Sequence, residues 1–573
     1  MKINIRMKAL KENGEALSTA ACALIVVLAI GGMTALLFWW NHESEPVIRM
    51  SPHEDLQAVI VYHDHGDAQW HRDFAYRDHP LTLVFAGRAI DLFGRSYIGM
   101  MHFQTLLALI WMVLVTLLAW RIGGPWAGAI GAVAAAAMPV VLASATTFDD
   151  HLTNITAATL AVVCIYFSDG LRRFWMGALV GLIAGRATHD AFVPSNGVMV
   201  TLAVGSALAG TVLDSWFGRD DDDPRRLTLR SPRRLTLEAT RVALFVAAAA
   251  VAFYYVARDN GSLDYMAYIF DGLSDYERTA MGAKSGPGAP LAVPHFLIAY
   301  HWGRPLALAA LSGAVLLFVT RAKSRYMLVF WTFGLVALVS ISAKKNTYYI
   351  FPAVVGAAPL VGVAFSSMRG KYRRLVFIAL GLALAATSLA RSTRAITTEP
   401  ITWDWEDPYL AYVQNANDVV LRPPVTEVNW AKEDARRFVA ALHARRGVRK
   451  IYPVAITGVD ATWALFRFEV NLLEPNVRFL KPRAALADYE RQYVDWVHLR
   501  IEAGKFDPTL RGLILSDINA VRGGLGPESD FAKETRSMRS VADEAAGYDL
   551  LLRTPNVLLF SPPSAYGPNL TSM

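Results

Sequence analysis

The stretch of sequence richest in ionisable side chains is VYHDHGDAQWHRDFAYRDHP, residues 61–80. It holds four aspartates and four histidines. A carboxylate close to a bound hydroxyl or amine can act as a general base, and Asp64 is the first candidate for that role. His65 and His79 are further candidate site residues. The alternative for each single residue is that it keeps a surface loop hydrated.

A second acidic motif is TTFDDHLTN, in which Asp149 and Asp150 precede His151. One of the two aspartates is a candidate catalytic acid, and His151 is a candidate beside them. The alternative is helix capping, because aspartate is a common N-cap residue. Aspartate with histidine also suits a divalent metal, but the spacing matches no specific ligand pattern. No cofactor is therefore predicted. A divalent metal is compatible with these residue types, but no motif indicates one.

Two adjacent lysines, Lys344 and Lys345, lie directly between two apolar runs, in SAKKNTYY. Lysine binds a phosphate as a point charge, and the neighbouring Tyr348 and Tyr349 suit the interfacial zone of a membrane. A lipid phosphate is therefore a natural partner. The alternative is that both lysines extend from a helix end toward water. A further polar group, GRATHD, ends another apolar run and contributes three candidates, Arg186, His189 and Asp190.

These residues belong to a chain of 573 residues that is 54% hydrophobic and only 18% charged, with a mean hydropathy of +0.30. That composition is typical of a polytopic membrane protein. Apolar runs long enough to cross a bilayer as helices predict about eleven transmembrane helices, at roughly 17–40, 101–120, 125–143, 152–167, 174–189, 193–213, 238–257, 295–319, 325–342, 347–366 and 374–390. The net charge of +7 is expected from basic cytoplasmic loops, so no nucleic-acid partner is predicted.

The loop charges predict which side of the membrane each loop faces. Four basic residues precede the first run and place the N-terminus in the cytoplasm: Lys2, Arg6, Lys8 and Lys11. Every further loop predicted inside contains arginine, as in DGLRRF and RGKYRR. The candidate site residues then share the outer face, because residues 41–100 and the loops near 144–151, 186–192 and 343–347 all lie outside. We expect an integral protein of the inner or plasma membrane.

From residue 391 to residue 573 the pattern is that of a soluble domain. An amphipathic helix over 429–447, a strand in RKIYPVAITG, a helix in DATWALFRFEVNLL and strands in RGLILSD and NVLLFSP are predicted. Alternating helices and strands indicate an extracytoplasmic C-terminal α/β domain, separate from a membrane domain over 1–390. Cys22 and Cys164 both lie in apolar runs and predict no disulfide.

The order of these motifs resembles that of the GT-C superfamily of membrane glycosyltransferases, in particular the branch of protein O-mannosyltransferases and lipid A aminoarabinose transferases (glycosyltransferase family 39 type). That branch has an acidic motif in the first outer loop, a basic or histidine residue before proline and leucine, a short helix ending in a glycine, an aspartate followed by leucine, and a late lysine followed by tyrosines. The matching segments here are YHDHGD, DHPL, AIDLFGRSYIGM, FDDHL and SAKKNTYYIFPAVVGAAPL.

The resemblance implies a hexosyl- or pentosyltransferase whose donor is a polyprenyl-phosphate sugar, with membrane lipids around it and an acceptor that the sequence does not name. It implies that Asp64 is the catalytic base and that Asp149 or Asp150 is a second acid. It further implies contacts to the donor phosphate from four residues: Lys344, Lys345, Arg186 and His79. The implied reaction is an inverting displacement at the anomeric carbon.

Two other classes of protein compete with this interpretation. A secondary transporter or lipid flippase with an extracytoplasmic domain would also be polytopic, but such proteins often show repeated halves and polar groups near the midplane. A nonenzymatic assembly factor would not need Asp64 and the two lysines to converge. The polar residues of this chain gather on one predicted side, and no repeat is visible, which favours the enzyme.

Overall fold

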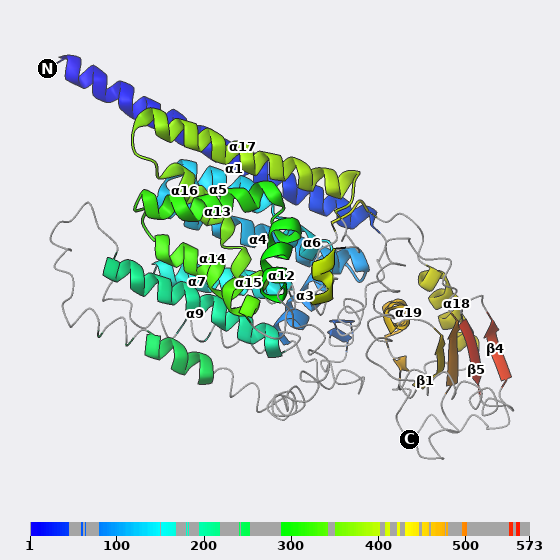
Figure 1. Ribbon diagram of the computed structural model, residues 1–573. Helices are drawn as coiled ribbons and strands as arrows, with labels where there is room; N and C mark the ends of the chain where they lie inside the picture. Colours follow the sequence, from blue (N-terminus) through cyan, green and yellow to red (C-terminus); the bar gives the residue numbers. More distant parts are fainter. Residues whose placement is uncertain are drawn as a thin grey trace. The chain divides into compact units, whose positions relative to one another are not determined.

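The structure is a computed structural model, drawn in Figure 1. It describes residues 2–44, 59–60, 63–64, 80–148, 151–167, 179, 182, 194–217, 236, 240, 242–251, 288–341, 350–401, 407–412, 421–424, 430–445, 450–457, 460–475, 477–479, 495–500, 549–553 and 557–561. The chain divides into two compact units. The first unit combines Met1–His42 with Met101–Pro424, and the second combines Glu43–Met100 with Val425–Met573.

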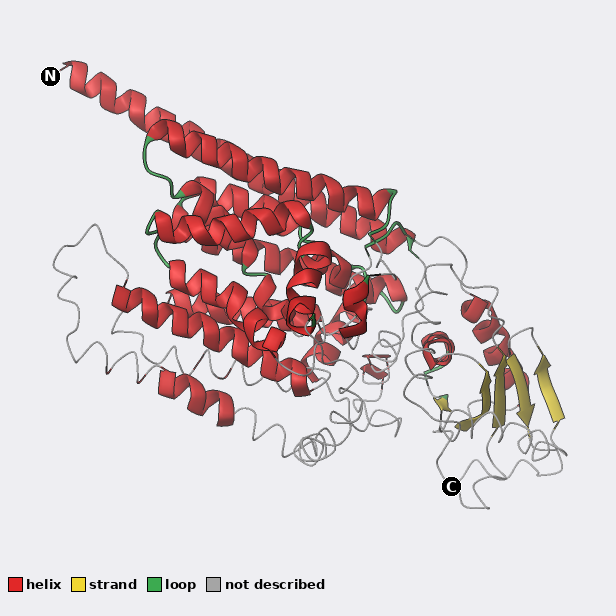
Figure 2. Cartoon of the chain, viewed as in Figure 1, coloured by secondary structure: helices red, strands yellow, loops and turns green. Residues whose placement is uncertain are grey.

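The first unit is built from helices, which Figure 2 shows in red. In chain order they are α1 (Lys2–Glu43), α4 (Tyr97–Gly123), α5 (Pro125–Ala136), α6 (Pro139–Ala145), α7 (His151–Phe167), α9 (Pro194–Phe217), α12 (Ala289–Phe296), η6 (Leu297–His301), α13 (Arg304–Val319), α14 (Arg325–Ile341), α15 (Phe351–Val354), α16 (Ala357–Ser366), α17 (Lys371–Thr397) and η8 (Pro408–Tyr412). Several begin with proline, whose fixed φ and missing N–H suit the first helical turn.

Three helices of the described part are long and apolar enough to cross a membrane: Ala16–Glu43, Tyr97–Gly123 and Lys371–Thr397. Two bent pairs pass the same test when each is taken as one span, which raises the number to five. The first pair, α5 with α6, bends by 56°, and the second, Ala289–His301 with α13, bends by 120°. Shorter apolar helices include α7, α14 and Phe351–Ser366. The chain therefore has a helical, membrane-type architecture, and the total of eleven spans remains a prediction.

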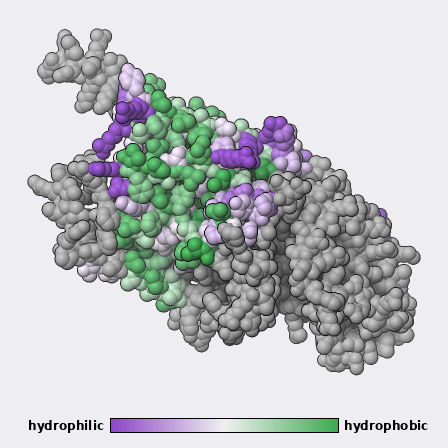
Figure 3. Space-filling model, in the orientation of Figure 1, coloured by the Kyte–Doolittle hydropathy of each residue, from purple (hydrophilic) through white to green (hydrophobic). Residues whose placement is uncertain are grey.

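The helices of the first unit pack closely because small residues line their contacts. Gly362 of α16 lies so near α5 that a Cβ atom there would be 2.2 Å from the Ala127 carbonyl oxygen and 3.0 Å from the Gly131 nitrogen. At the sharp bend, Gly303 has a φ of 71°, a value that glycine adopts without steric cost. The outer surface is also apolar, with Leu24, Val315 and others exposed, and Figure 3 shows this hydrophobic surface in green. Such a surface suits lipid rather than water.

Polar side chains join the helices near their ends. Asn41 of α1 donates from Nδ2 to Thr105 Oγ1 at 2.7 Å, and Trp40 donates from Nε1 to the carbonyl of Arg422 at 2.7 Å. At other helix ends, the carboxylate of Asp214 accepts from the backbone N–H groups of Tyr326 and Met327 at 3.1 and 2.8 Å. Asp214 of α9 thus caps the start of α14, where backbone donors lack partners within the helix.

The second unit contains a mixed five-stranded sheet in the order β2-β1-β3-β5-β4. The strands are β1 (Lys450–Thr457), β2 (Arg478–Phe479), β3 (Asp495–Arg500), β4 (Asp549–Arg553) and β5 (Val557–Ser561), drawn in yellow in Figure 2. β1 pairs in parallel with β2 and β3, whereas β5 runs antiparallel to β3 and β4. The helices are α3 (Pro80–Phe93), α18 (Trp430–Arg445) and α19 (Asp460–Leu473).

Most of the predicted elements of this α/β domain are present. The helices predicted over 429–447 and 460–473 are α18 and α19, and two predicted strands are β1 and β5. RGLILSD, the remaining predicted strand, lies outside the described residues. Phe438 of α18 meets Phe466 of α19 edge to face, with ring centroids 5.3 Å apart. Both rings are fully buried, so they form the apolar contact between these two helices.

Candidate active site

Asp64 is held by an arginine in the second unit. Arg95 directs Nη1 at Asp64 Oδ1, 2.5 Å away, and Nη2 at Asp64 Oδ2, 2.7 Å away. This is the paired geometry in which arginine binds a carboxylate most strongly. The Asp64 side chain is 13% exposed and that of Arg95 is 29% exposed. The first predicted catalytic residue therefore sits in a largely shielded ion pair.

Arg95 also contacts the end of helix α19. Its Nε donates to the carbonyl of Leu472 at 3.1 Å, and Nη2 donates to the carbonyl of Asn471 at 2.8 Å. Tyr97, in the first turn of α4 and still within the second unit, meets Phe468 edge to face, with ring centroids 6.5 Å apart. Within the second unit, the segment that follows α3 is thus attached to α19.

His63 lies between two carboxylates. Its Nδ1 is 3.2 Å from Asp64 Oδ1, and its Nε2 is 2.9 Å from Asp91 Oδ1. Ionised carboxylates only accept hydrogen bonds, so both contacts are hydrogen bonds at once only when both ring nitrogens carry a proton. Arg88 pairs with the other oxygen of Asp91 at 3.1 Å. The sequence motifs did not single out His63, Asp91 or Arg95, although His63 lies within YHDHGD and the other two lie within AIDLFGRSYIGM.

The pKa of Asp64 reflects two opposing effects. Burial by itself would raise the pKa, because desolvation disfavours the charged carboxylate. The hydrogen bonds and positive charges of Arg95 and His63 outweigh burial and hold the pKa of Asp64 below its usual value of 3.8. Asp64 is thus a stable carboxylate at neutral pH, and as a proton acceptor it is weaker than a free aspartate.

A cluster of aromatic and histidine side chains lies in the first unit, around Phe351. The ring of His151, the residue after Asp150, meets Phe351 edge to face with centroids 5.2 Å apart. His301, at the end of η6, meets the same phenylalanine at 5.1 Å. His301 is fully buried, and neither of its ring nitrogens has a hydrogen-bond partner among the described residues. π-helical turns such as η6 are frequent at functional sites.

The first unit also contains a histidine–aspartate pair that the sequence motifs did not indicate. His295 of α12 is 2.5 Å from Asp407 through Nε2 and Oδ2. The carboxylate also accepts from Tyr300 Oη at 3.3 Å and from the backbone N–H of Tyr409 at 2.9 Å, and the Tyr409 ring stacks on His295 with centroids 4.5 Å apart. The two halves are 112 residues apart, so no local motif indicates the pair.

Most of the predicted site residues lie outside the described part of the chain. These are His65, His79, Asp149, Asp150, Arg186, His189, Asp190, Lys344, Lys345, Tyr348 and Tyr349. Asp64 and His151 are the predicted residues whose surroundings the structure gives. Within that described part, no group of three or more histidine, cysteine, aspartate or glutamate side chains could hold a metal ion.

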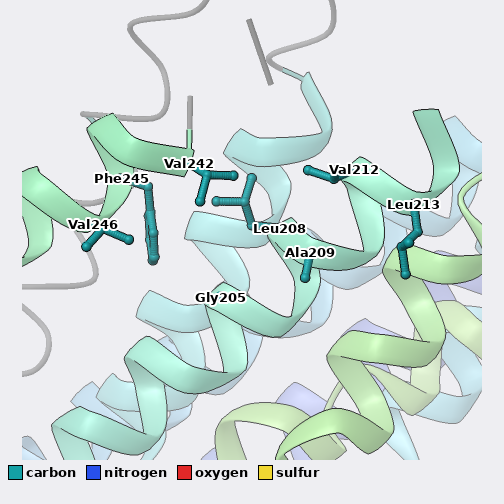
Figure 4. Close-up of a pocket in the computed structure, with 8 residues that line it drawn as sticks. All are labelled: Gly205, Leu208, Ala209, Val212, Leu213, Val242, Phe245 and Val246. Atoms are coloured by element: carbon teal, nitrogen blue, oxygen red, sulfur yellow. The ribbon is translucent and has the colours of Figure 1, made fainter. Parts of the chain in front are cut away.

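An apolar pocket of about 410 Å³ lies between α9 and the helical segment 242–251 (Figure 4). Val242, Phe245 and Val246 line one side, and five residues of α9 line the other: Gly205, Leu208, Ala209, Val212 and Leu213. A Cβ atom at Gly205 would meet no described atom within 4 Å, so this glycine helps to leave the space open. These eight described lining residues include no polar side chain, which distinguishes the pocket from the ionic network around Asp64.

The bent apolar helices and the smaller α/β unit are similar in fold to solved GT-C membrane glycosyltransferases. The comparisons that show this are with ArnT, the lipid A aminoarabinose transferase, of Cupriavidus metallidurans. Its structure bound to undecaprenyl phosphate matches 94% of this chain and 99% of its own, with 15% identity and a TM-score of 0.52. The structure of the same ArnT in the apo state matches 96% of this chain and 100% of its own, with 13% identity and a TM-score of 0.50.

A weaker match is the oligosaccharyltransferase of Archaeoglobus fulgidus, with 12% identity, a TM-score of 0.40 and coverage of 82% of this chain and 65% of its own. No model of a known protein family matches the sequence, and no curated protein sequence matches it. The resemblance seen in the motifs is confirmed at the level of the fold.

Proposed function

We propose that this protein transfers a glycosyl group from a polyprenyl-phosphate-linked sugar to an acceptor at the outer face of the membrane. The observation that carries the proposal is the shared fold, which extends over nearly the whole of this chain and of ArnT. That ArnT structure holds undecaprenyl phosphate, the lipid phosphate that such a donor would release. The acceptor is a protein, a lipid or a glycan.

In the proposed reaction, a hydroxyl or amine of the acceptor attacks the anomeric carbon of the sugar. The bond from this carbon to the phosphate oxygen breaks, and the lipid phosphate leaves with the electron pair. Asp64 takes the proton of the acceptor as a general base. An ionised carboxylate has about four positions for accepting hydrogen bonds, of which Arg95 uses two and His63 one, so about one remains for the acceptor.

The donor phosphate is assigned to Lys344, Lys345, Arg186 and His79, and a second acidic role to Asp149 or Asp150. The contact between His151 and Phe351 supports the grouping of two of these motifs. His151 directly follows the two aspartates, and Phe351 comes six residues after Lys345. The segments that carry the second acid and the lysines therefore lie next to each other at their described ends.

The contacts at the helix ends support a site on one side of the membrane. Two hydrogen bonds join segments that the loop charges predict to be outside. One is between Trp40 and Arg422, and the other is between Asn41 and Thr105. Asp214 joins α9 to α14 at ends that are predicted to be inside. No pair among these joins a predicted outer end to a predicted inner end, as a consistent topology requires.

The test is a transfer assay with the purified protein in lipid nanodiscs. Radiolabelled undecaprenyl-phosphate sugars, each carrying a different hexose or pentose, are incubated with candidate protein, lipid and glycan acceptors. Sugar transfer that depends on the lipid-linked donor is expected. The rival transporter or flippase is tested in parallel with sealed vesicles, and movement of the intact lipid-linked sugar across the bilayer without transfer would overturn the proposal.

A further inference from the structure

The guanidinium group of Arg95 connects two segments of the second unit that are far apart in the sequence. It makes four hydrogen bonds, two to the carboxylate of Asp64 and two to the carbonyls of Asn471 and Leu472. Arginine has five N–H donors in a rigid plane, so nearly all of its capacity is used here. Asp64 is 31 residues from Arg95, and Leu472 is 377 residues from it.

The carbonyls that Arg95 contacts belong to the last turn of α19. The last carbonyls of a helix have no partner within the helix and carry partial negative charge, so a cation is favoured there. The side chain of Asn471 is fully buried and donates to the carbonyl of Val477 at 2.9 Å. This bond fixes the turn after the helix, so the carbonyls are presented from a well-supported position.

We propose that Arg95 is a positioning residue that holds the Asp64 carboxylate against the C-terminal α/β domain, so that the chemistry of Asp64 depends on this domain. The inference rests on the proposed function, in which Asp64 is the general base, and it gives the α/β domain a role in the reaction. Lysine cannot replace Arg95, because a single ammonium lacks the planar fork that reaches two carboxylate oxygens and two carbonyls.

This role has a consequence that a purely structural ion pair lacks. The described charged groups that face Asp64 are Arg95 and His63, with Asp91 and Arg88 behind His63; from α19, backbone carbonyls face Arg95. If the Arg95 charge is removed, burial still raises the pKa of Asp64 while its main counter-charge is lost. A general base must be ionised. With a raised pKa of Asp64, the loss of activity on acidification would therefore begin at a higher pH.

The experiment uses the full chain in nanodiscs and compares Arg95→Gln, Arg95→Lys and Arg437→Gln. The matched control is Arg437 of α18, which forms an exposed ion pair with Glu433. Exposed ion pairs contribute little to the stability of a folded protein. We expect both Arg95 variants to lose about 100-fold in kcat, the order of loss that misplacement of a reacting group causes. In Arg95→Gln the acid limb of kcat/KM should also move to higher pH, and in Arg95→Lys it should move less. Arg437→Gln should match wild type.

A second measurement does not need a sugar donor. Hydrogen exchange of the backbone amides should become faster in Arg95→Lys, both in the last turn of α19 and around Asp64, and should stay unchanged in Arg437→Gln. If the wild-type chain transfers no sugar, the proposed function is wrong and the exchange data still decide the anchoring by Arg95. Unchanged exchange in Arg95→Lys overturns the inference, as does an Arg95→Gln variant with wild-type kcat and an unmoved acid limb.

Discussion

At the scale of single residues, Asp64 is the side chain on which the proposed chemistry most depends. Asp64→Asn keeps the size of the side chain but removes the carboxylate that would accept the proton. Turnover should fall by about 100- to 10,000-fold, the usual range for a positioned general base, while donor binding should change little. Labelled-sugar transfer and donor binding are measured side by side.

The controls for this prediction come from the same stretch of sequence. Asp67→Asn and Asp73→Asn, which we assign to a hydrated loop, should behave much closer to wild type; both positions lie outside the described residues. Normal turnover in Asp64→Asn, or loss of turnover in Asp67→Asn, would show that the base has been assigned to the wrong aspartate.

The two lysines are expected to act on the donor. Changing Lys344 and Lys345 together to alanine should weaken binding of a polyprenyl phosphate, because each charged contact contributes about 1.5–3 kcal/mol. Changing both to arginine should retain part of the binding. Equilibrium binding of undecaprenyl phosphate to each variant measures the effect. Wild-type affinity in the double alanine variant would mean that these lysines only extend toward water.

His301 allows a prediction about stability. Both of its ring nitrogens are buried without a hydrogen-bond partner in the described part of the chain, so His301→Leu loses no such bond and relieves a cost of about 1–3 kcal/mol. Thermal unfolding in detergent should show equal or higher stability. The neighbouring Trp302 is the control, because its Nε1 donates to the carbonyl of Val354 at 3.0 Å. Trp302→Phe should therefore unfold at a lower temperature, and a destabilised His301→Leu would reveal a polar partner for the histidine.

At the scale of elements, the contact between α5 and α16 depends on the absence of side chains. Gly362→Ala would place a Cβ atom 2.2 Å from the Ala127 carbonyl oxygen, so one of the two helices must move. Overpacking of this kind costs about 1–3 kcal/mol, and the unfolding temperature should fall. Gly32→Ala on α1 is the matched control, because its Cβ would meet no atom of the described residues within 4 Å. Equal stability of the two variants would show that the helices separate without cost.

At the scale of the whole molecule, the predicted topology places the N-terminus inside and the C-terminal α/β domain outside. Protease added to spheroplasts should remove a tag fused after Met573 and leave a tag before Met1 intact. The physical basis is the retention of lysine and arginine on the cytoplasmic side of short loops. A protected C-terminal tag together with an accessible N-terminal one would reverse the topology, and the proposed site would then face the cytoplasm.

Much of the architecture was accessible from the sequence, because it depends on local patterns. Lipid offers no hydrogen-bond partners, so spanning segments must be apolar helices whose length the hydropathy reveals. The predicted runs at 17–40, 101–120 and 374–390 correspond to the three long apolar helices of the described part. In the soluble domain, period and composition indicated α18, α19, β1 and β5. The similarity in fold to GT-C glycosyltransferases was indicated by the order of short motifs along the chain.

The partners of the site residues were decided only by the tertiary structure. Asp64 could be selected as an ionisable residue near the membrane, but nothing in the periodicity of the chain indicates that Arg95 binds it or that α19 anchors Arg95. The pair of His295 and Asp407 was missed for the same reason. Hydropathy and periodicity report which face of an element is buried, whereas an ion pair depends on where two distant segments meet. That meeting is set by the packing of the folded chain.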